Sequence, residues 1–329
     1  MPAPALDREA VTSLVRAATA APSLHNAQPW RFRWHSGTGA LDLRADPERT
    51  MPRLDPGHRA LHLGCGAALF NLRVAAADAG RPTDVRLLPD PADPWLLATV
   101  GLSGTGRPDD ELARLYPAIS RRHTSRHPFE ERPVPPDVQE ALGEAARQEG
   151  AQLVFPGPWH TEALLDHVRD AEDRDSLEPE RLADVRRWVR VGERDGGAAL
   201  DGIPEYAFGP RKRGGRAPVR DFAGRETVPG RAAAVFETVP NLVLLGTEND
   251  RSADWLRAGQ ALERVLLRAT LAGLATALTS HSLERPDLRE LARDPESSLG
   301  FVQMVLRLGY GAPGAVTPRR PVEDVLDMG

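Results

Sequence analysis

Two apolar helical segments of this chain match each other in sequence, and this match constrains the possible folds more than any other feature. The first is expected at about residues 58–79 and the second at about 252–272. Aligned without a gap, the segments share glycine and apolar positions: Gly66 with Gly259, Ala68 with Ala261, Leu69 with Leu262, Leu72 with Val265, and Gly80 with Gly273. Two alanine- and leucine-rich helices can align by chance, but the matched glycines favour an internal duplication. A repeat this long predicts a fused dimer rather than a solenoid.

The segments around the two helices support the same interpretation. Apolar residues at helical spacing from Val11 to Ala18 predict a first helix that ends before Pro22. Alternating residues at 30–34 and 41–45 flank a glycine-containing turn and predict a β-hairpin. Further strands are expected at 84–88, 96–102, 241–246 and 301–308.

The duplication predicts two halves, residues 1–112 and 113–329, which meet in a transition at about 103–120 that contains glycine and proline. Within the second half, the segment at about 192–231 lacks apolar periodicity and is rich in glycine, arginine and proline. An insert of this length in a compact domain is typical of a lid, a binding loop or a disordered segment.

Composition excludes several classes of protein. The 329 residues carry a formal net charge of −5, which argues against general affinity for nucleic acid or anionic membranes. The single cysteine, Cys65, excludes an intrachain disulfide and falls on the apolar face of a helix, where we expect an inert core residue. The N-terminus does not resemble a signal peptide, and no apolar stretch approaches the roughly 20 residues that span a bilayer. We therefore expect a cytoplasmic protein.

Three short segments carry candidate binding chemistry. Residues 21–30 have the sequence APSLHNAQPW, in which two prolines bracket a polar turn suited to a flat heteroaromatic ligand. The alternative is an ordinary connector whose side chains satisfy local backbone groups. Residues 121–129 (RRHTSRHPF) alternate basic and hydroxyl side chains, a pattern fitted to phosphate, although a solvated basic patch is the simpler alternative. Residues 317–321 (TPRRP) form a third, basic segment.

The order of these segments resembles the nitroreductase superfamily. Its members carry an Arg-x-Ser/Thr-x-Arg/Lys run, then a Pro-Ser-x-x-Asn-x-Gln-Pro-Trp loop that reaches the partner subunit's flavin, and a basic pair near the C-terminus. Here the first half keeps the loop at 22–30 without an arginine run before it. The second half keeps the run at 122–126 but has RQEGA at 147–151 in place of the loop. This division resembles the single-chain, Acg-type branch, as do the segments 64–73 (GCGAALFNLR), 201–204 (DGIP) and 306–311 (LRLGYG).

The resemblance implies an α+β, nitroreductase-like fold, in which two fused halves form a pseudo-dimer around one FMN. Each half would be a mainly antiparallel sheet packed with helices. The residues implied at the cofactor are Pro22, Ser23 and Asn26 beside the flavin ring, Arg122, His123, Thr124 and Arg126 at the phosphate or ring, Thr279, Ser280 and His281 near flavin N5, and Arg319 and Arg320 at the phosphate. Of the last two, Arg320 is the first candidate.

The implied chemistry belongs to the flavin, so no catalytic side chain is expected. The expected cycle is ping-pong, with hydride entering from NAD(P)H and leaving to a nitroaromatic, quinone or similar small-molecule acceptor. The alternative is an FMN-sequestering or storage protein, in which Tyr206, Phe208 or the basic run 211–213 covers the flavin and prevents nucleotide turnover. A third possibility keeps the fold without flavin. Because fusion removes the need for a partner subunit, a monomer is expected.

Other candidate features are weaker. His25 and His123 could donate protons, but hydrogen-bonded structural histidines are the simpler interpretation. The glycine-rich loop at 101–106 has little phosphate-binding character, and we interpret it as a linker. The sequence has no metal-ligand spacing and no dinucleotide-binding glycine motif.

Overall fold

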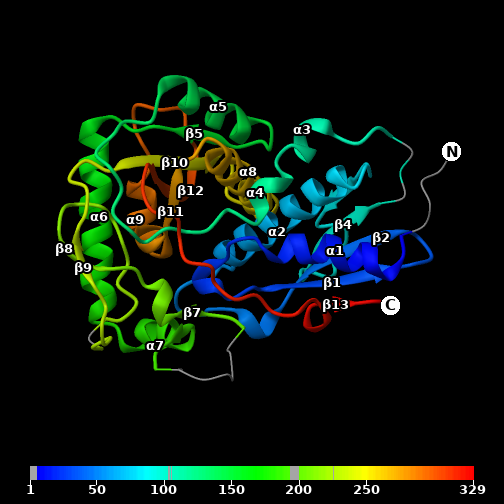
Figure 1. The fold of residues 1–329 in the computed structure, drawn as a ribbon, viewed down its shortest axis with the longest axis horizontal. Helices are drawn as coiled ribbons and strands as arrows, with labels where there is room; N and C mark the ends of the chain where they lie inside the picture. Colours follow the sequence, from blue (N-terminus) through cyan, green and yellow to red (C-terminus); the bar gives the residue numbers. More distant parts are fainter. Residues whose placement is uncertain (1–5, 103, 105, 193–199, 225) are drawn as a thin grey trace.

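The structure is a computed structural model that describes residues 6–102, 104, 106–192, 200–224 and 226–329 (Figure 1). Its helices are α1 (Arg8–Thr19), α2 (Arg59–Asp78), α3 (Asp110–Ala113), α4 (Tyr116–Ile119), α5 (Pro136–Arg147), α6 (Pro158–Ser176), α7 (Pro179–Arg187), α8 (Ser252–Leu271) and α9 (Pro286–Leu291). Its strands are β1 (Trp30–His35), β2 (Ala40–Ala45), β3 (Asp84–Leu87), β4 (Leu96–Gly101), β5 (Gln152–Val154), β6 (Val189–Arg190), β7 (Ile203–Pro204), β8 (Arg211–Gly214), β9 (Ala233–Val235), β10 (Asn241–Thr247), β11 (Ala275–Thr279), β12 (Phe301–Gly309) and β13 (Leu326–Asp327). Short 3-10 helices are η1 (Leu24–Asn26), η2 (Pro47–Arg49), η3 (Glu205–Ala207), η4 (His281–Glu284) and η5 (Val322–Asp324).

The two main sheets have the same strand connectivity. One has the order β1-β2-β4-β3, with β13 added beside β1, and the other has the order β5-β10-β12-β11. All neighbours in these two four-strand series are antiparallel. Helix α2 follows β2 and precedes β3, just as α8 follows β10 and precedes β11. The α+β fold with two related halves is therefore what the structure contains, and the predicted hairpin and strands are confirmed.

The two matched helices pack against each other at the centre of the molecule (Figure 1). A Cβ on Gly66 would lie 3.0 Å from the Cα of Gly259 and closer still to the carbonyl oxygen of Leu256. Reciprocally, a Cβ on Gly259 would lie 2.9 Å from the Cα of Gly66 and closer still to the carbonyl oxygen of Leu63. Leu63 and Leu256 are themselves equivalent in the gapless alignment. The two glycines therefore meet at the point where the helices cross, because only glycine lets the backbones approach this closely.

Helix α2 corrects one expectation from the sequence. By length and composition alone, Arg59–Asp78 is apolar enough to cross a membrane, with a mean hydropathy of 1.3. The statement that no apolar stretch approaches this length is therefore wrong for this segment. In the structure 83% of the window is buried, so its apolar character is that of a central core helix packed on all sides.

The C-terminal tail crosses from the second half to the first (Figure 1). After β12 it runs back to β13, which pairs in parallel with β1 through Phe32 and Leu326. The last residues of the predicted second half thus complete the sheet of the first half. The boundary near residue 112 stays a prediction.

The described part of the predicted insert contains short regular elements, although residues 193–199 and 225 lie outside the described ranges. Strand β7 pairs with β6, and β8 pairs with β9. Ile203, Phe208 and Ala223 are buried together in an apolar cluster with Phe222 packed against it. The insert therefore has a small core of its own. The predicted linker loop at 101–106 also falls partly outside the described residues, at positions 103 and 105.

Candidate functional site

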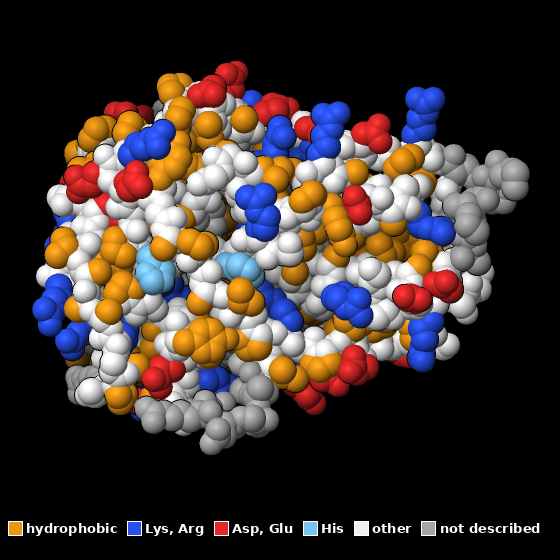
Figure 2. All heavy atoms as spheres, in the orientation of Figure 1, with side chains coloured by type: hydrophobic (Ala, Val, Ile, Leu, Met, Phe, Trp, Pro, Cys, Tyr) orange, Lys and Arg blue, Asp and Glu red, His pale blue; other side chains and the backbone are white. Residues whose placement is uncertain are grey.

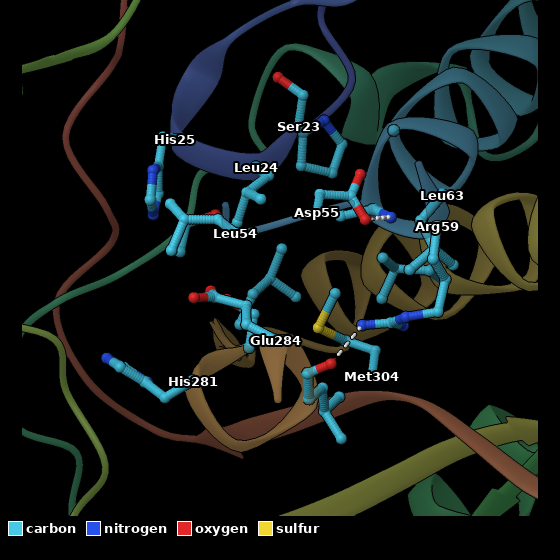
Figure 3. A pocket seen from close by; sticks show the side chains of 18 of the residues that line it. Ser23, Leu24, His25, Leu54, Asp55, Arg59, Leu63, His281, Glu284 and Met304 are labelled. Carbon is cyan, nitrogen blue, oxygen red and sulfur yellow. Dashed lines mark hydrogen bonds between the residues drawn. The ribbon is translucent and has the colours of Figure 1, made fainter. Parts of the chain in front are cut away.

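A cavity of about 680 Å³ is lined by residues from both halves (Figure 3), a volume in the range of small-molecule and cofactor sites. Most of the residues implied by the sequence motifs line it: Pro22, Ser23, Asn26, Arg122, His123, Thr124, Arg126, Ser280, His281 and Arg319. Two do not. Thr279 is fully buried behind the wall, and Arg320 lies outside the cavity. The fold thus assembles segments that are up to about 300 positions apart in sequence.

The loop before β1 has an unusual backbone. His25, Asn26 and Gln28 have positive φ angles of 49°, 55° and 52°. Three non-glycine residues in the left-handed region within four positions store strain, which structures tolerate mainly at functional sites. The hydroxyl of Ser23 accepts a hydrogen bond from the backbone N–H of Gln28 at 2.9 Å, and the amide of Asn26 donates to the carbonyl of Gly202 at 2.9 Å. The loop is therefore rigid and is tied to the insert.

Within the arginine run, Arg126 is the side chain whose surroundings most clearly suit an anionic ligand. Its guanidinium donates to the carbonyl of Ala207 at 2.9 Å and lies 5.0 Å from the ring centroid of Phe222. Among the described residues no carboxylate lies within ion-pair distance of it. Burial lowers the pKa of Arg126 to about 10. A desolvated positive charge without an internal counter-ion is costly, so this end of the cavity suits an anion.

Arg122, in the same run, is more strongly committed to the protein. Its side chain is 2% exposed, lies 3.4 Å from Glu263 and donates to the carbonyl of Ala20 at 3.1 Å. Burial raises the pKa of Glu263, which weakens its value as a counter-ion. Ser125, between the two arginines, donates its hydroxyl to the carbonyl of Ala312. Arg122 therefore adds positive charge near the cavity while it also holds α1 and α8 together.

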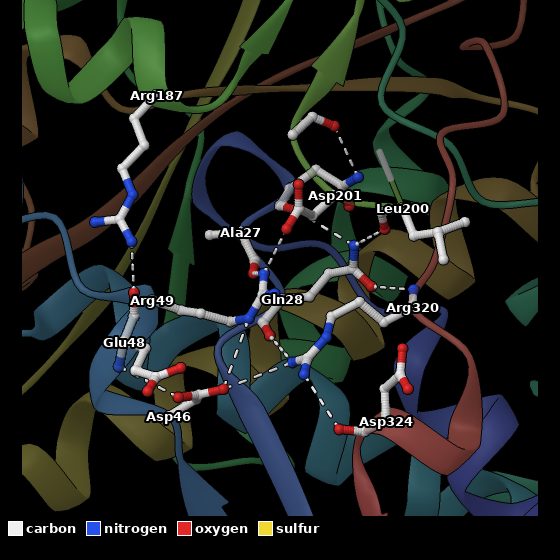
Figure 4. Close-up of polar contacts among 12 residues, drawn as sticks. Ala27, Gln28, Asp46, Glu48, Arg49, Arg187, Leu200, Asp201, Arg320 and Asp324 are labelled. Atoms are coloured by element: carbon white, nitrogen blue, oxygen red, sulfur yellow. Dashed lines mark hydrogen bonds and ion pairs between the residues drawn. The ribbon is translucent and has the colours of Figure 1, made fainter. Parts of the chain in front are cut away.

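The two C-terminal arginines differ in position. Arg319 lines the cavity and donates to the carbonyls of Thr19, Ala20 and Ala21 at the end of α1, where a cation complements the helix dipole. Burial and the nearby charge of Arg122 lower its pKa to about 9. Arg320 instead lies 3.7 Å from Asp46, and its backbone N–H donates to Gln28 (Figure 4). The sequence made Arg320 the first candidate of this pair, but the structure places Arg319 at the cavity instead, because the backbone turns Arg320 toward the first sheet.

The segment after β11 brings further polar groups to the cavity. Ser280 donates its hydroxyl to Glu284 at 2.7 Å, and the buried Thr279 donates to the carbonyl of Pro218 at 3.4 Å. Glu284 also accepts from Arg220 at 2.8 Å. Arg220 belongs to the predicted insert, so this ion pair fastens the insert to the cavity wall.

Two buried histidines line the same region (Figure 3). His25 Nε2 lies 2.8 Å from the Arg220 guanidinium, which can only donate, so this nitrogen accepts and the ring is neutral. Burial, with the charges of Arg220 and Arg126, holds the pKa of His25 well below its usual range. Burial, with the charges of Arg220 and His25, does the same for His281, whose Nε2 lies 3.6 Å from Glu172. Neutral rings are poor proton donors but good hydrogen-bonding groups.

The depressed pKa of His281 predicts a pH dependence of stability. The folded protein keeps this ring neutral, whereas the unfolded chain binds a proton below about pH 6.5. Its contribution to stability is therefore present above that pH and lost as the pH falls. Between pH 7 and pH 5, the unfolding free energy of the wild type should fall by about 1–2 kcal/mol more than that of the His281→Leu variant. Urea unfolding at both pH values measures this difference. A variant of the half-exposed His35, on the outer hairpin, is the control. Equal pH slopes for wild type and His281→Leu would contradict the assignment.

Several cavity residues had no sequence motif to reveal them. Arg59, Arg220 and Phe222 all line the cavity, yet Arg59 belongs to no motif, and the composition of the insert around Arg220 and Phe222 did not single out either residue. Phe222 also makes an edge-on contact with His25, with ring centroids 5.4 Å apart. Tyr206, by contrast, is 67% exposed and does not line the cavity.

The donor set fits FMN. Buried guanidinium groups at one end suit a phosphate. Small and apolar residues beside it, among them Pro22, Gly64 and Leu278, form walls against which a planar ring can pack. On the face drawn in Figure 2 the described basic side chains lie scattered among acidic and apolar ones. The cavity lining contains seven arginines and four carboxylates, an excess of positive charge.

Comparison with known proteins identifies the family. No family model matches the chain. Proteins of Mycobacterium tuberculosis H37Rv are similar to it in sequence. "Putative NAD(P)H nitroreductase Rv3131" is 33% identical, over 98% of this chain and 92% of its own length. "Putative NAD(P)H nitroreductase acg" is 31% identical, over 100% of this chain and 98% of its own length. Among solved structures, an FMN-bound nitroreductase from Bacteroides fragilis covers 63% of this chain and 92% of its own, with 17% identity and a TM-score of 0.36. The FMN- and NADPH-dependent nitroreductase NfnB from sphigopyxis sp. strain HMH covers 65% and 98%, with 14% identity and a TM-score of 0.38. On the identity to its sequence relatives over nearly the whole of both chains, the protein belongs to the nitroreductase superfamily, in its single-chain Acg-type branch.

Proposed function

We propose that this protein binds one FMN in the cavity and acts as an oxidoreductase between NAD(P)H and a nitroaromatic, quinone or similar acceptor. The observation that carries the proposal is Arg126, a desolvated guanidinium that lines the cavity without a carboxylate partner among the described residues. The family supports it, since relatives carry the name NAD(P)H nitroreductase. When bound, FMN would supply the hydride chemistry.

The chain's own residues would bind and orient the cofactor. Arg126, Thr124 and Arg122 would hold the phosphate, with Arg319 adding positive charge from the α1 side. Ser23 would lie on one side of the ring, and its hydroxyl is already fixed by Gln28. We propose that backbone N–H groups within 278–281 face flavin N5, where a donor would orient hydride exchange.

A second candidate function, FMN sequestration, is favoured by the position of the insert. Ile203, Pro218, Val219, Arg220 and Phe222 all come from the predicted insert and line the cavity. We propose that they cover the ring, which would limit the access of nicotinamide. In that case the protein would store or sequester FMN with little turnover.

One experiment separates these functions. The visible spectrum of the purified protein is recorded before and after incubation with FMN, followed by anaerobic addition of NADPH and NADH. Bound flavin that bleaches with a nucleotide supports the oxidoreductase. Flavin that bleaches only with dithionite supports sequestration. Protein that takes up no flavin contradicts both.

The Arg220 ion pair gives a further prediction about the insert. Because Arg220 bonds to His25 at 2.8 Å and to Glu284 at 2.8 Å, the Arg220→Met variant should hold the insert less firmly. Loss of charged hydrogen bonds should speed FMN release by about tenfold or more, measured from the rise in flavin fluorescence after dilution. Arg216→Met is the control, because Arg216 is also in the insert but pairs with Glu162 away from the cavity. Equal release rates in both variants would show that Arg220 does not hold the insert.

We further propose that the halves 1–112 and 113–329 arose by duplication of a subunit that formerly dimerised. A chain that contains both halves needs no partner subunit, so we propose a cytoplasmic monomer. Size-exclusion chromatography with light scattering tests the oligomeric state directly, and a dimer mass would contradict this proposal.

A further inference from the structure

A second buried arginine lies in the cavity, away from the phosphate-binding run. Arg59 is the first residue of α2, and its side chain is buried and lines the cavity (Figure 3). Its guanidinium donates to the carbonyls of Gln303 at 2.5 Å and Leu283 at 3.2 Å. These contacts hold the head group in one place, but neither partner carries a charge.

Arg59 has no ion-pair partner within 4 Å in the described ranges of the chain. The nearby carboxylates are already engaged. Asp55 accepts hydrogen bonds from the backbone N–H groups of Ala60 at 3.0 Å and Leu61 at 2.9 Å, and Asp250 is held by Arg289 through both oxygens. A positive charge in the first turn of a helix also opposes the helix dipole. Burial and the charge of Arg289 lower the pKa of Arg59 to about 10. Each of these costs would be offset by an anion in the cavity.

Arg59 and the arginine run are anchored at different positions of the sheet that backs the cavity. Thr124 forms a β-bridge with Thr276, which pairs across β11 and β12 with Leu308. Arg59 instead bonds to Gln303, five residues further along β12. At about 3.3 Å per residue, the two points are roughly 16 Å apart along the strand. The backbone positions that anchor Arg59 and the run are therefore well separated, which leaves room for a second anionic group at Arg59.

Apolar side chains line the cavity near Arg59, beside the carboxylates Asp55, Asp250 and Glu284, which are engaged by other groups. Leu54, Leu63, Leu283 and Met304 line the cavity in this region (Figure 3), as does the ring of Trp255. A group that reaches Arg59 therefore contacts hydrocarbon on the way. An inorganic anion would make no use of these apolar side chains, whereas an apolar molecule with a terminal carboxylate would match both the guanidinium and the side chains beside it.

We propose that Arg59 binds the carboxylate of a second ligand, an aromatic or similarly apolar acid that shares the cavity with the cofactor. The inference rests on the proposed function for the identity of the cofactor, and it names the class of acceptor or effector that this site selects. The carboxylate pairs with Arg59, and the apolar body lies against the leucine and methionine side chains, toward the position of the ring.

Calorimetric titration with benzoate and benzamide tests the proposal, because the two probes have nearly the same shape and differ in charge. The protein is titrated as purified and again after saturation with FMN, so the readout does not need a flavin signal. We expect benzoate to bind at least about tenfold more tightly than benzamide in both preparations, as a charged hydrogen bond would give. Equal affinities, or benzoate binding that FMN abolishes, would overturn the proposal. Absence of FMN binding alone would instead count against the proposed function.

Variants separate Arg59 from the rest of the cavity. Arg59→Met should remove the preference for benzoate, and Arg59→Lys should keep most of it, while FMN affinity stays within about threefold in both. Arg293→Met is the charge-matched control, since Arg293 lines the mouth of the same cavity but is exposed. A preference that survives Arg59→Met, or that Arg293→Met removes, would contradict the assignment. So would a loss of FMN affinity in both Arg59 variants, which would make Arg59 part of the cofactor site. If the methionine variant does not fold, the wild-type comparison and Arg59→Lys still decide the question.

Discussion

The Gly66→Ala variant is expected to lose about 2–4 kcal/mol of unfolding free energy, although alanine is the better helix former. A Cβ at this position would lie 3.0 Å from the Cα of Gly259 and closer still to a backbone oxygen of the facing helix. Backbone atoms cannot rotate away, so α2 and α8 would have to separate. These helices join the two halves of the chain, so the cavity that both halves line should widen as well.

The measurement is urea unfolding of Gly66→Ala, Gly259→Ala and a control within another helix. Gly143 lies inside α5, where an added Cβ would meet only the flexible end of Arg147 at 3.4 Å. Gly143→Ala should therefore be neutral or gain up to about 1 kcal/mol from helix propensity. If Gly66→Ala were as stable as Gly143→Ala, the helices would not need their close crossing, and the account of the central interface would be wrong.

The second large effect is expected for Arg126→Met. Removal of a charge-assisted contact with phosphate should weaken FMN binding by about 10- to 100-fold. The unfolding free energy of the FMN-free protein should change little or rise, within about 1 kcal/mol, because the variant also removes a half-buried, desolvated charge that lacks a carboxylate partner among the described residues. If Arg126 were purely structural, the variant would keep its FMN affinity and lose unfolding free energy.

FMN titration by fluorescence quenching measures the predicted loss of affinity, and urea unfolding of the FMN-free protein measures the predicted effect on stability. Arg121→Met is the matched control, because Arg121 belongs to the same run but is exposed and does not line the cavity. Its FMN affinity should stay within about twofold of wild type, as expected for a solvated surface charge. If Arg126→Met retained full FMN affinity, the phosphate would not lie at this run and the proposed orientation of the cofactor would fail.

The bounds of the two matched helices were predicted well from the sequence. The period of apolar residues and the glycines that end each helix gave α2 and α8 to within one residue. Gly80 and Gly273 have φ angles of +71° and +76°, as a glycine just past a helix end requires. These features depend on residues close together in the chain, so a single sequence contains the information.

Most of the residues implied at the cofactor line the cavity, but the order of the motifs rather than physical chemistry singled them out. Composition and spacing left the loop at 21–30 open between a ligand-binding loop and an ordinary connector, and the arginine run open between a phosphate site and a surface patch. The resemblance to a family selected the binding interpretation. It ranked Arg320 ahead of Arg319, whereas Arg319 lines the cavity and Arg320 does not, because adjacent residues point in different directions and only the path of the tail decides which one faces the cavity.

By itself, then, the sequence determined the first helix, the two matched helices and six of the strands, their repetition in two halves, and the family. The tertiary structure alone decided that Gly66 meets Gly259, that Arg59 lies unpaired by any carboxylate of the described chain, and that Arg220 ties the insert to His25. The physical reason is the range of the interactions. Backbone hydrogen bonds and apolar periodicity act over a few residues, whereas burial and charge compensation depend on every segment that packs around a side chain.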